Sequence, residues 1–399
     1  MRISTANAFA SGIDSLTRRQ SELSGLQDQM TSGKRVAKAS DDPAAAARAE
    51  RALASISRTE TSQRAVDASK VVMTQTESSL GSADDLLQRA RELMVSAGNA
   101  SYSDAERASI AGELRTLRDQ LFTVANQSDG AGTYLFGGQG ATQKPFVDAP
   151  GGVQYAATGG QTRTEAGTNL PLTTDGQASW LSARTGNGVF VTSAAAGAAN
   201  ATIDTGIVSD PSALTGADYS LNFSVAGGVT TYAVLKNGLA TAVTAAPYVS
   251  GQAITVDGMT VSVSGTPATG DQFQIVPSTP TLSVFATLDK AITGLQTTGR
   301  TASQITQATG ENLRDVDSVM GNLPTARAAA GAVLNRIDSE TDRLGAQKLA
   351  STTERSNAED VDMVHAISDF QNKQSGYDAA LKSYAMVQRL SLFQYVNGG

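Results

Sequence analysis

Residues 29–45 read Gln-Met-Thr-Ser-Gly-Lys-Arg-Val-Ala-Lys-Ala-Ser-Asp-Asp-Pro-Ala-Ala, and this stretch ends one helical pattern and begins another. Ser32-Gly33 predicts the end of the first helix, because glycine is the usual residue past a helix end. Asp42 can cap the next helix, and Pro43 suits its first position, where a missing N–H costs nothing. The stretch is therefore a short connector between two helices.

The helix before the connector carries a stripe in alternating steps of four and three residues, and the C-terminus repeats it. The N-terminal stripe is Phe9, Ile13, Leu16, Gln20, Leu23, Gln27 and Met30. The C-terminal stripe is Met363, Ile367, Phe370, Gln374, Tyr377, Leu381, Tyr384, Gln388, Ser391 and Tyr395. Such a stripe is typical of one seam of a long helix that packs on another. The apolar members of both stripes are the candidate assembly interface, although periodicity alone favours a seam within one bundle.

Helical patterns continue inward from both ends of the chain. Ser103 and Glu106 form a capping-box pattern at the start of one helix. Pro324 lies inside a long helical pattern and should kink or divide that helix. The predicted helices cover residues 5–31, 43–97, 103–126, 282–295, 302–353 and 359–395.

The composition changes between residues 139 and 280, which hold only four basic and eight acidic residues. The segment is rich in Gly, Thr, Ser and Val, which favours strands and turns. Residues 254–263 read as a hairpin, because Asp257-Gly258 supplies the two positive-φ positions of a type I′ turn. Residues 219–225, 231–235 and 271–276 are further predicted strands, and 186–202 is a predicted loop.

The predicted fold class is α+β: a long antiparallel helical bundle built from both chain ends, with terminal coiled-coil helices and a β-rich domain inserted in the middle. An N-terminal assembly helix and connector (1–43) precede the first half of the bundle core (44–138). The β-rich outer insert (139–280) follows. The second half of the core (281–358) and a C-terminal assembly helix (359–399) complete the chain.

Composition excludes several classes of function. The 399 residues carry a net charge of −7 and a pI of about 4.9, which argues against nucleic-acid binding and against a polybasic membrane surface. No apolar run approaches the roughly 18 residues of a spanning helix. The start, residues 1–7, lacks the apolar core of a Sec signal peptide. With no cysteine, disulfides, thiol catalysis and Cys-ligated zinc are excluded.

Chemistry-bearing motifs are few, so we expect no enzyme, cofactor or metal. His365 is the only histidine, which excludes His–His metal pairs and most Ser-His-Asp arrangements, and we expect it to be a helix-surface or packing residue. The carboxylates at 41–42 and 359–362 lie at predicted helix starts, where the helix dipole favours negative charge. No P-loop or dinucleotide fingerprint occurs. Trp180 is expected to be buried in the insert.

The connector resembles the signature of the flagellin superfamily. Its variants Gly33-Lys34-Arg35 and Ser40-Asp41-Asp42-Pro43 are more similar to the hook–filament junction proteins of the FlgL family than to flagellin. Tyr134-Leu135-Phe136-Gly137-Gly138, residues 327–338 and residues 377–396 are also similar to that family. The resemblance covers both flanks, 1–138 and 281–399. Residues 36–39 lack the apolar-Pro pair expected before Ser40.

The resemblance implies a structural role outside the cell. A protein of this family would be exported unfolded through the flagellar type III channel, with an export chaperone and without a Sec signal. It would then assemble as a ring of its own copies on the extracellular flagellum, between the first hook-associated protein, FlgK, on the hook side and flagellin on the filament side.

For the chain ends we hypothesise that residues 1–33 and 360–399 are poorly ordered in the free monomer, because isolated helices are marginal in water. Assembly would bury their stripes. Gln20, Gln27, Gln374 and Gln388 would fix the register, as polar seam residues do.

Two other functions remain open. The nearest is a flagellin filament subunit, which would be the bulk protein of the filament instead of a minor component. The other, from a different class, is a secreted coiled-coil adhesin whose β insert binds a host surface or glycan.

Overall fold

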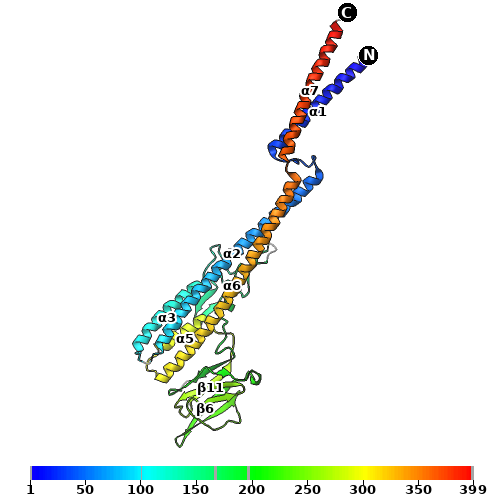
Figure 1. The fold of residues 1–399 in the computed structure, drawn as a ribbon. Helices are drawn as coiled ribbons and strands as arrows, with labels where there is room; N and C mark the ends of the chain where they lie inside the picture. Colours follow the sequence, from blue (N-terminus) through cyan, green and yellow to red (C-terminus); the bar gives the residue numbers. More distant parts are fainter. Residues whose placement is uncertain (1, 100, 166–168, 196–197, 397–399) are drawn as a thin grey trace. The chain divides into compact units, whose positions relative to one another are not determined.

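A computed structural model describes residues 2–99, 101–165, 169–195 and 198–396. Long helices form the two ends of the sequence, and a β domain forms its middle (Figure 1). The expected α+β class is confirmed. Residues up to Arg64, with those from Thr341 onward, form one compact unit, and residues 65–340 form the other. In the described part of the chain, no helix is long and apolar enough to cross a membrane.

The first unit contains α1 (Arg2–Ser32), α7 (Met363–Val396), the start of α2 (Pro43–Ala97) and the end of α6 (Ala302–Glu359). The α2 and α6 segments run antiparallel, with Ser55 and Ser351 joined by a 3.0 Å hydroxyl hydrogen bond. In this unit, α6 buries side chains every seven residues, at Leu344, Ser351 and Ala358. This repeat is that of a coiled-coil seam.

Helix α6 is not divided at Pro324, contrary to part of the prediction. Pro324 lies on the exposed side of the helix, where water can bind the carbonyl that loses its intrahelical partner. Its neighbours Val319 and Leu323 are almost completely buried and hold the helix against the core. Packing therefore overrides the local preference for a break.

In the second unit, α3 (Asp104–Ala125) packs along α5 (Val284–Gln296). The predicted capping box is present at the start of α3: the Ser103 hydroxyl oxygen accepts the Glu106 N–H at 3.4 Å, and the Ser103 N–H donates to the Glu106 carboxylate at 2.7 Å. Leu114, Leu121 and Leu288 are buried in this bundle.

Residues 139–185 pack with these helices, although the predicted insert begins at residue 139. They contain β1 (Phe146–Ala149), β2 (Gly152–Tyr155) and the short helix α4 (Gly176–Trp180). Trp180 is fully buried and stacks on Phe285 of α5, with ring centroids 5.9 Å apart and planes within 8°. We call residues 65–185 and 281–340 of the second unit the helical body. Trp180 is buried, as expected, but its partners belong to this helical body.

The β domain follows, with two antiparallel sheets that share one hydrophobic core. One sheet has the strand order β3-β12-β6-β7-β8 with β9 beside β7, and the other has the order β10-β11-β4 with β5 beside β11. A 3-10 helix covers Pro211–Ala213. The strands are β3 (Phe190–Ala194), β4 (Ala201–Ile203), β5 (Ile207–Val208), β6 (Tyr219–Ala226), β7 (Val229–Lys236), β8 (Leu239–Ala240), β9 (Ala246–Pro247), β10 (Ala253–Val256), β11 (Met259–Gly265) and β12 (Gln272–Pro277).

The predicted hairpin is confirmed: Asp257 and Gly258 join β10 to β11 with φ of +39° and +79°. Strands also occur at the three other predicted places. The loop predicted at 186–202 was wrong, because it contains β3 and β4. These strands consist mainly of small and polar residues around Phe190, which is buried, so their composition hides their position in the sheets. Residues 196–197 lie outside the described residues.

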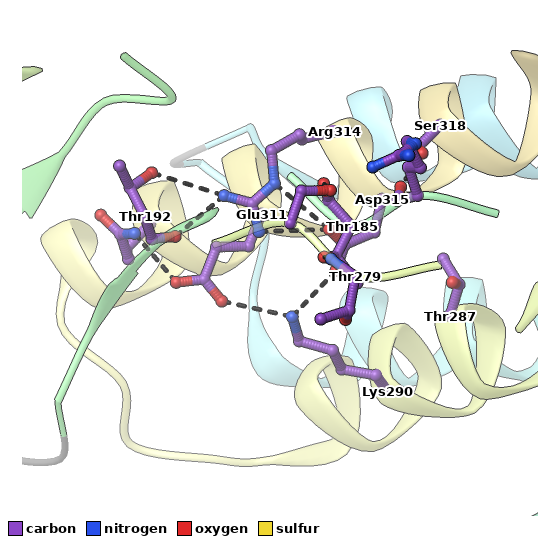
Figure 2. A network of polar contacts seen from close by, with 12 residues as sticks. Thr185, Thr192, Thr279, Thr287, Lys290, Glu311, Arg314, Asp315 and Ser318 are labelled. Carbon is purple, nitrogen blue, oxygen red and sulfur yellow. Dashed lines mark hydrogen bonds and ion pairs between the residues drawn. The ribbon is translucent and has the colours of Figure 1, made fainter. Parts of the chain in front are cut away.

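Polar contacts join this domain to α6 (Figure 2). The Arg314 guanidinium donates to the Thr192 carbonyl of β3 at 2.9 Å and pairs with Asp315 at 3.1 Å. Lys290 of α5 lies between Asp315, at 3.1 Å, and Glu311, at 3.4 Å. Because Arg314 and Asp315 are almost completely buried, this network fixes the first strand of the domain on the helix.

Candidate assembly interface

The connector after α1 is tied to the connector before α7 by backbone hydrogen bonds. Gly33 has φ of +70°, which glycine adopts without strain, and its carbonyl accepts the Val361 N–H at 3.0 Å. The Arg35 N–H donates to the Glu359 carbonyl at 2.7 Å. The two connectors therefore form a short antiparallel pairing, and Val36 is buried beside it.

Charged side chains reinforce this pairing. Lys34 Nζ lies 3.3 Å from Glu359 Oε2, and Arg355 Nε lies 2.8 Å from Glu359 Oε1. The Arg35 guanidinium donates to the Ala358 carbonyl at 2.9 Å and pairs with Asp42 at 3.3 Å. Lys34 and Arg35 of the family signature thus hold the end of α6.

The carboxylates of the signature organise the start of α2. Asp42 Oδ1 accepts the N–H groups of Ala44 and Ala45 at 3.1 and 3.0 Å, and Pro43 begins the helix. The Ala45 N–H, with Arg35 nearby, holds the pKa of the Asp42 carboxyl below its usual range. Asp41 Oδ2 accepts the N–H groups of residues 37 and 38, and Asp41 Oδ1 lies 3.5 Å from the Ser40 hydroxyl. These carboxylates therefore cap backbone, as expected.

Helices α1 and α7 form an antiparallel pair (Figure 1). The rings of Phe9 and Tyr384 meet edge to face with centroids 5.5 Å apart. Further along, Glu22 Oε2 and Lys373 Nζ form an ion pair at 3.0 Å, which lowers the pKa of the Glu22 carboxyl. The two terminal helices therefore pair with each other, more than three hundred residues apart in the chain.

The seam between these helices shares only every second position with the predicted stripes. Half-buried residues of α1 include Phe9, Gly12, Leu16, Leu23, Leu26 and Met30. On α7, Ala366 is buried and Phe370, Gly376, Tyr377, Ala380 and Tyr384 are half-buried. A Cβ added to Gly12 would lie 3.5 Å from the Tyr384 ring, so small residues complete the seam.

The remaining predicted stripe residues do not lie in this seam. Ile13, Met363, Ile367 and Leu381 are 50%, 43%, 42% and 41% exposed. Gln20, Gln27 and Gln374 are also exposed, so these glutamines do not set the register between α1 and α7. The side chains of Gln388, Ser391 and Tyr395 lie outside those that the structure describes.

The second signature segment is buried in the helical body. Phe136 is fully buried against Trp180, and the Tyr155 hydroxyl donates to the Phe136 carbonyl at 3.0 Å. Gly138 has φ of +59°, and a Cβ there would lie 2.0 Å from the Thr158 carbonyl oxygen. Tyr134 and Gly137 complete the turn through a 3.0 Å backbone hydrogen bond. This segment therefore stabilises the fold of the second unit.

Some contacts of the interface were not predicted. Glu359, Asp360 and Lys373 each join segments that are distant in the chain, and their charge alone gave no indication of this role. His365 is exposed on the surface of α7, which is one of the two positions expected for it. Among the described residues, no group of three or more His, Asp and Glu side chains is placed to hold a metal ion.

Comparison with known families supports the expected superfamily. Residues 3–141 match the bacterial flagellin N-terminal helical region, and residues 313–396 match the bacterial flagellin C-terminal helical region. Residues 191–277 match the D2-like domain of flagellar hook-associated protein 1. The paired terminal helices and the connector therefore define a protein of the flagellin class.

Similar proteins specify the family more closely. The chain is 40% identical to flagellar hook-associated protein 3 of Salmonella typhimurium over 38% of its length, and that match spans about half (48%) of the relative. It is 28% identical to hook-associated protein 3 of Escherichia coli over 99% of both chains. A crystal structure of Xanthomonas campestris FlgL is 30% identical, with a TM-score of 0.67 over 76% of this chain and 99% of that one.

The chain belongs to the hook-associated protein 3 (FlgL) family. It is a structural protein of the flagellar hook–filament junction.

Proposed function

We propose that the chain forms a ring of its own copies that joins the first hook-associated protein, on the hook side, to flagellin, on the filament side. The names of its relatives support a place among the hook-associated proteins. The match of the β domain to a domain of hook-associated protein 1 also supports shared architecture with the neighbour on the hook side.

The observation that carries the proposal is the incomplete burial of the terminal helix pair. Ile13, Ile367 and Leu381 remain about half exposed, and seam residues such as Leu16 and Tyr377 are only half-buried. Full burial of one such side chain contributes about 1.5–3 kcal/mol. Ordering the backbone opposes this by about 1–2 kcal/mol per residue. The contact of one subunit with a neighbour is therefore weak, and a closed ring, in which several such contacts add, is stable.

Two further parts of the proposal concern export and chemistry. The chain has no cysteine, which suits export as an unfolded chain through the flagellar type III channel with a chaperone. His365, the only histidine of the sequence, is exposed on α7, and the proposed role is structural, without catalysis.

Deletion of the gene, scored by electron microscopy, tests the junction role. We expect cells with hooks but without filaments, and flagellin shed into the medium. Complementation with the intact gene should restore filaments. Filaments of normal number and length on the deletion strain would contradict the proposal.

The flagellin-class matches at both ends also fit a filament subunit, and the amount of protein separates the two functions. A junction protein is a minor component of purified flagella, whereas a filament subunit is the bulk of them. Quantitative mass spectrometry of purified flagella should therefore find this chain at a small fraction of the flagellin amount.

Limited proteolysis tests whether the two ends of the chain are ordered in the free monomer. Because few of the described side chains of α1 and α7 are completely buried, we expect cleavage within residues 1–33 and 360–399 of the purified monomer before cleavage of the helical body. Terminal segments as resistant as residues 65–340 would contradict this expectation.

A further inference from the structure

The larger sheet of the β domain has one face on the shared hydrophobic core and one face directed away from it. Leu221 and Phe223 of β6 are buried in the core, so the residues that alternate with them point outward. The strand registers align the outward residues of five strands in one row: Ser193, Gln274, Ser220, Leu235 and Ala240.

Two shorter rows lie beside this one. The first contains Gln272, Asn222 and Ala233, and the second contains Ser224, Thr231 and Pro247. The pairs Val191–Val276 and Ala226–Val229 complete the outward positions. We call this surface of β3, β12, β6, β7, β8 and β9 the outer sheet face. It consists of small, amide and aliphatic side chains.

The outer sheet face has no charged residue. Between residues 187 and 277, the charged residues are Lys236 and five aspartates: Asp204, Asp210, Asp218, Asp257 and Asp271. The aspartates lie in loops and turns. Lys236 lies on the core side of β7, over the Tyr219 ring, and pairs with Asp257 at 2.6 Å. Charged residues are depleted at the centre of protein–protein interfaces, and the outer sheet face has this composition.

The outer sheet face is open in a single subunit. Within the described part of the chain, no helix packs substantially on β6, β7 or β12. Gln274 and Ser224 are exposed, and Val229 is 59% exposed. The face is therefore available to another protein.

We propose that the outer sheet face binds the D2-like domain of the first hook-associated protein, sheet against sheet. Two sheets pack face to face when small and aliphatic side chains interdigitate between them, and long charged side chains would hold them apart. Residues 191–277 match the D2-like domain of hook-associated protein 1, so a sheet domain of the same type is present in the neighbour on the hook side. The inference rests on the proposed function, because it names the contact between the ring and that neighbour.

Two observations argue against a second copy as the occupant. A contact between identical faces is isologous and joins copies in closed pairs, whereas a ring is built from head-to-tail contacts. One Lys and five Asp also give each β domain a net charge of −4, so two such domains repel each other. The occupant is therefore a related domain on a different chain.

A photoreactive residue identifies the occupant directly. Gln274→p-benzoylphenylalanine lies in the long row, and Thr255→p-benzoylphenylalanine, exposed on β10 of the other sheet, is the matched control. After irradiation of purified flagella, we expect adducts with the first hook-associated protein, several-fold more abundant for position 274. Adducts at position 274 with flagellin, adducts of twice the 41.0 kDa chain mass, or incorporated chain without adducts would overturn the proposal.

Burial of the outer sheet face is tested separately with single cysteines, because the natural chain has none. Gln274→Cys and Ser224→Cys should react with a maleimide in the purified monomer and at least several-fold more slowly in purified flagella. Thr255→Cys should react equally fast in both. Equal reactivity of positions 224 and 274 in the two forms would overturn the proposal.

The two levels of the inference fail in different ways. If the natural chain is absent from purified flagella, the proposed function fails together with this contact. If the chain is present and the cysteines on the outer sheet face stay reactive, only the assignment of this face fails.

Discussion

At the scale of single residues, the glycines of the signature have different tasks. Gly33 and Gly138 both have positive φ, but a Cβ on Gly33 would meet no atom within 4 Å. Gly138 is enclosed, and its carbonyl accepts the Thr162 N–H at 3.2 Å as well as the Thr173 hydroxyl. A side chain is therefore excluded at Gly138 by space, and at Gly33 by conformation alone.

Gly138→Ala should destabilise the helical body strongly, because the new Cβ would lie 2.0 Å from the Thr158 carbonyl oxygen. We expect a loss of more than about 4 kcal/mol in the free energy of unfolding, the range of severe single substitutions. Gly130→Ala is the control: its φ is +79° but the space around it is open, so backbone strain of about 1–3 kcal/mol remains. Urea unfolding followed by the fluorescence of Trp180 measures both, and equal losses would contradict the steric argument.

Asp42 should make the stability of the chain depend on pH. Its pKa is lowered in the folded state by the Ala45 N–H, so its carboxylate stabilises the fold above the unfolded pKa of about 3.9. This contribution is lost as the pH falls through the lower folded pKa. Asn caps helices as well as Asp but does not titrate, so Asp42→Asn should show a smaller fall in melting temperature between pH 5 and 2. Identical falls in both proteins would exclude this role.

At the scale of helices and strands, the pairing of the chain ends could be predicted, but the seam could not be placed correctly. A pattern of apolar residues selects Ile13 and Ile367, whereas the packed seam contains Gly12, Gly376 and Ala380. Small residues allow the two helices to approach closely, and this role is not visible as hydrophobicity. Gln20, Gln27 and Gln374 were assigned to the stripes because they continue the four-three spacing of the apolar residues.

The β domain shows the same limit. Asp257-Gly258 predicted its turn, because only a few residue pairs adopt two positive φ values. Strands β3 and β4 were missed, since their residues are held by partners far along the chain: β3 pairs with β12, and Arg314 binds its backbone. The composition of a short segment does not indicate which distant segments will pair with it.

Helix α6 allows a direct test of packing against local preference. Pro324→Ala restores an intrahelical hydrogen bond on an exposed face, so we expect the free energy of unfolding to rise by up to about 3 kcal/mol. The gain is reduced by about 0.4–1 kcal/mol, because proline also restricts the unfolded chain. Gly321→Ala, on the same exposed side with open space around it, should gain about 1 kcal/mol. Unfolding in urea measures both variants, and a loss for Pro324→Ala would mean that the proline is required for the local helix shape.

At the scale of the whole molecule, the β domain is an excursion whose two ends meet. The Thr185 N–H donates to the Thr279 carbonyl at 3.0 Å, and the Ser278 hydroxyl donates to the Thr185 carbonyl at 2.6 Å. Ala183 and Leu282 then pair through hydrogen bonds of 2.9 and 3.0 Å. The segments that enter and leave the β domain are therefore held together by their own hydrogen bonds.

Removal of residues 187–277, which joins Gly186 directly to Ser278, should leave the helical body folded and the junction able to assemble. The ends are already adjacent, so closure requires no long linker. A wider deletion of residues 145–275 is the contrasting variant: it removes Phe146 and Trp180, both fully buried, and replacing one such aromatic by Ala typically costs about 3–5 kcal/mol. Circular dichroism and Trp180 fluorescence report folding of the first variant, and filament counts in complemented cells report assembly. A folded 187–277 variant that fails to restore filaments would show that the β domain is itself part of the junction.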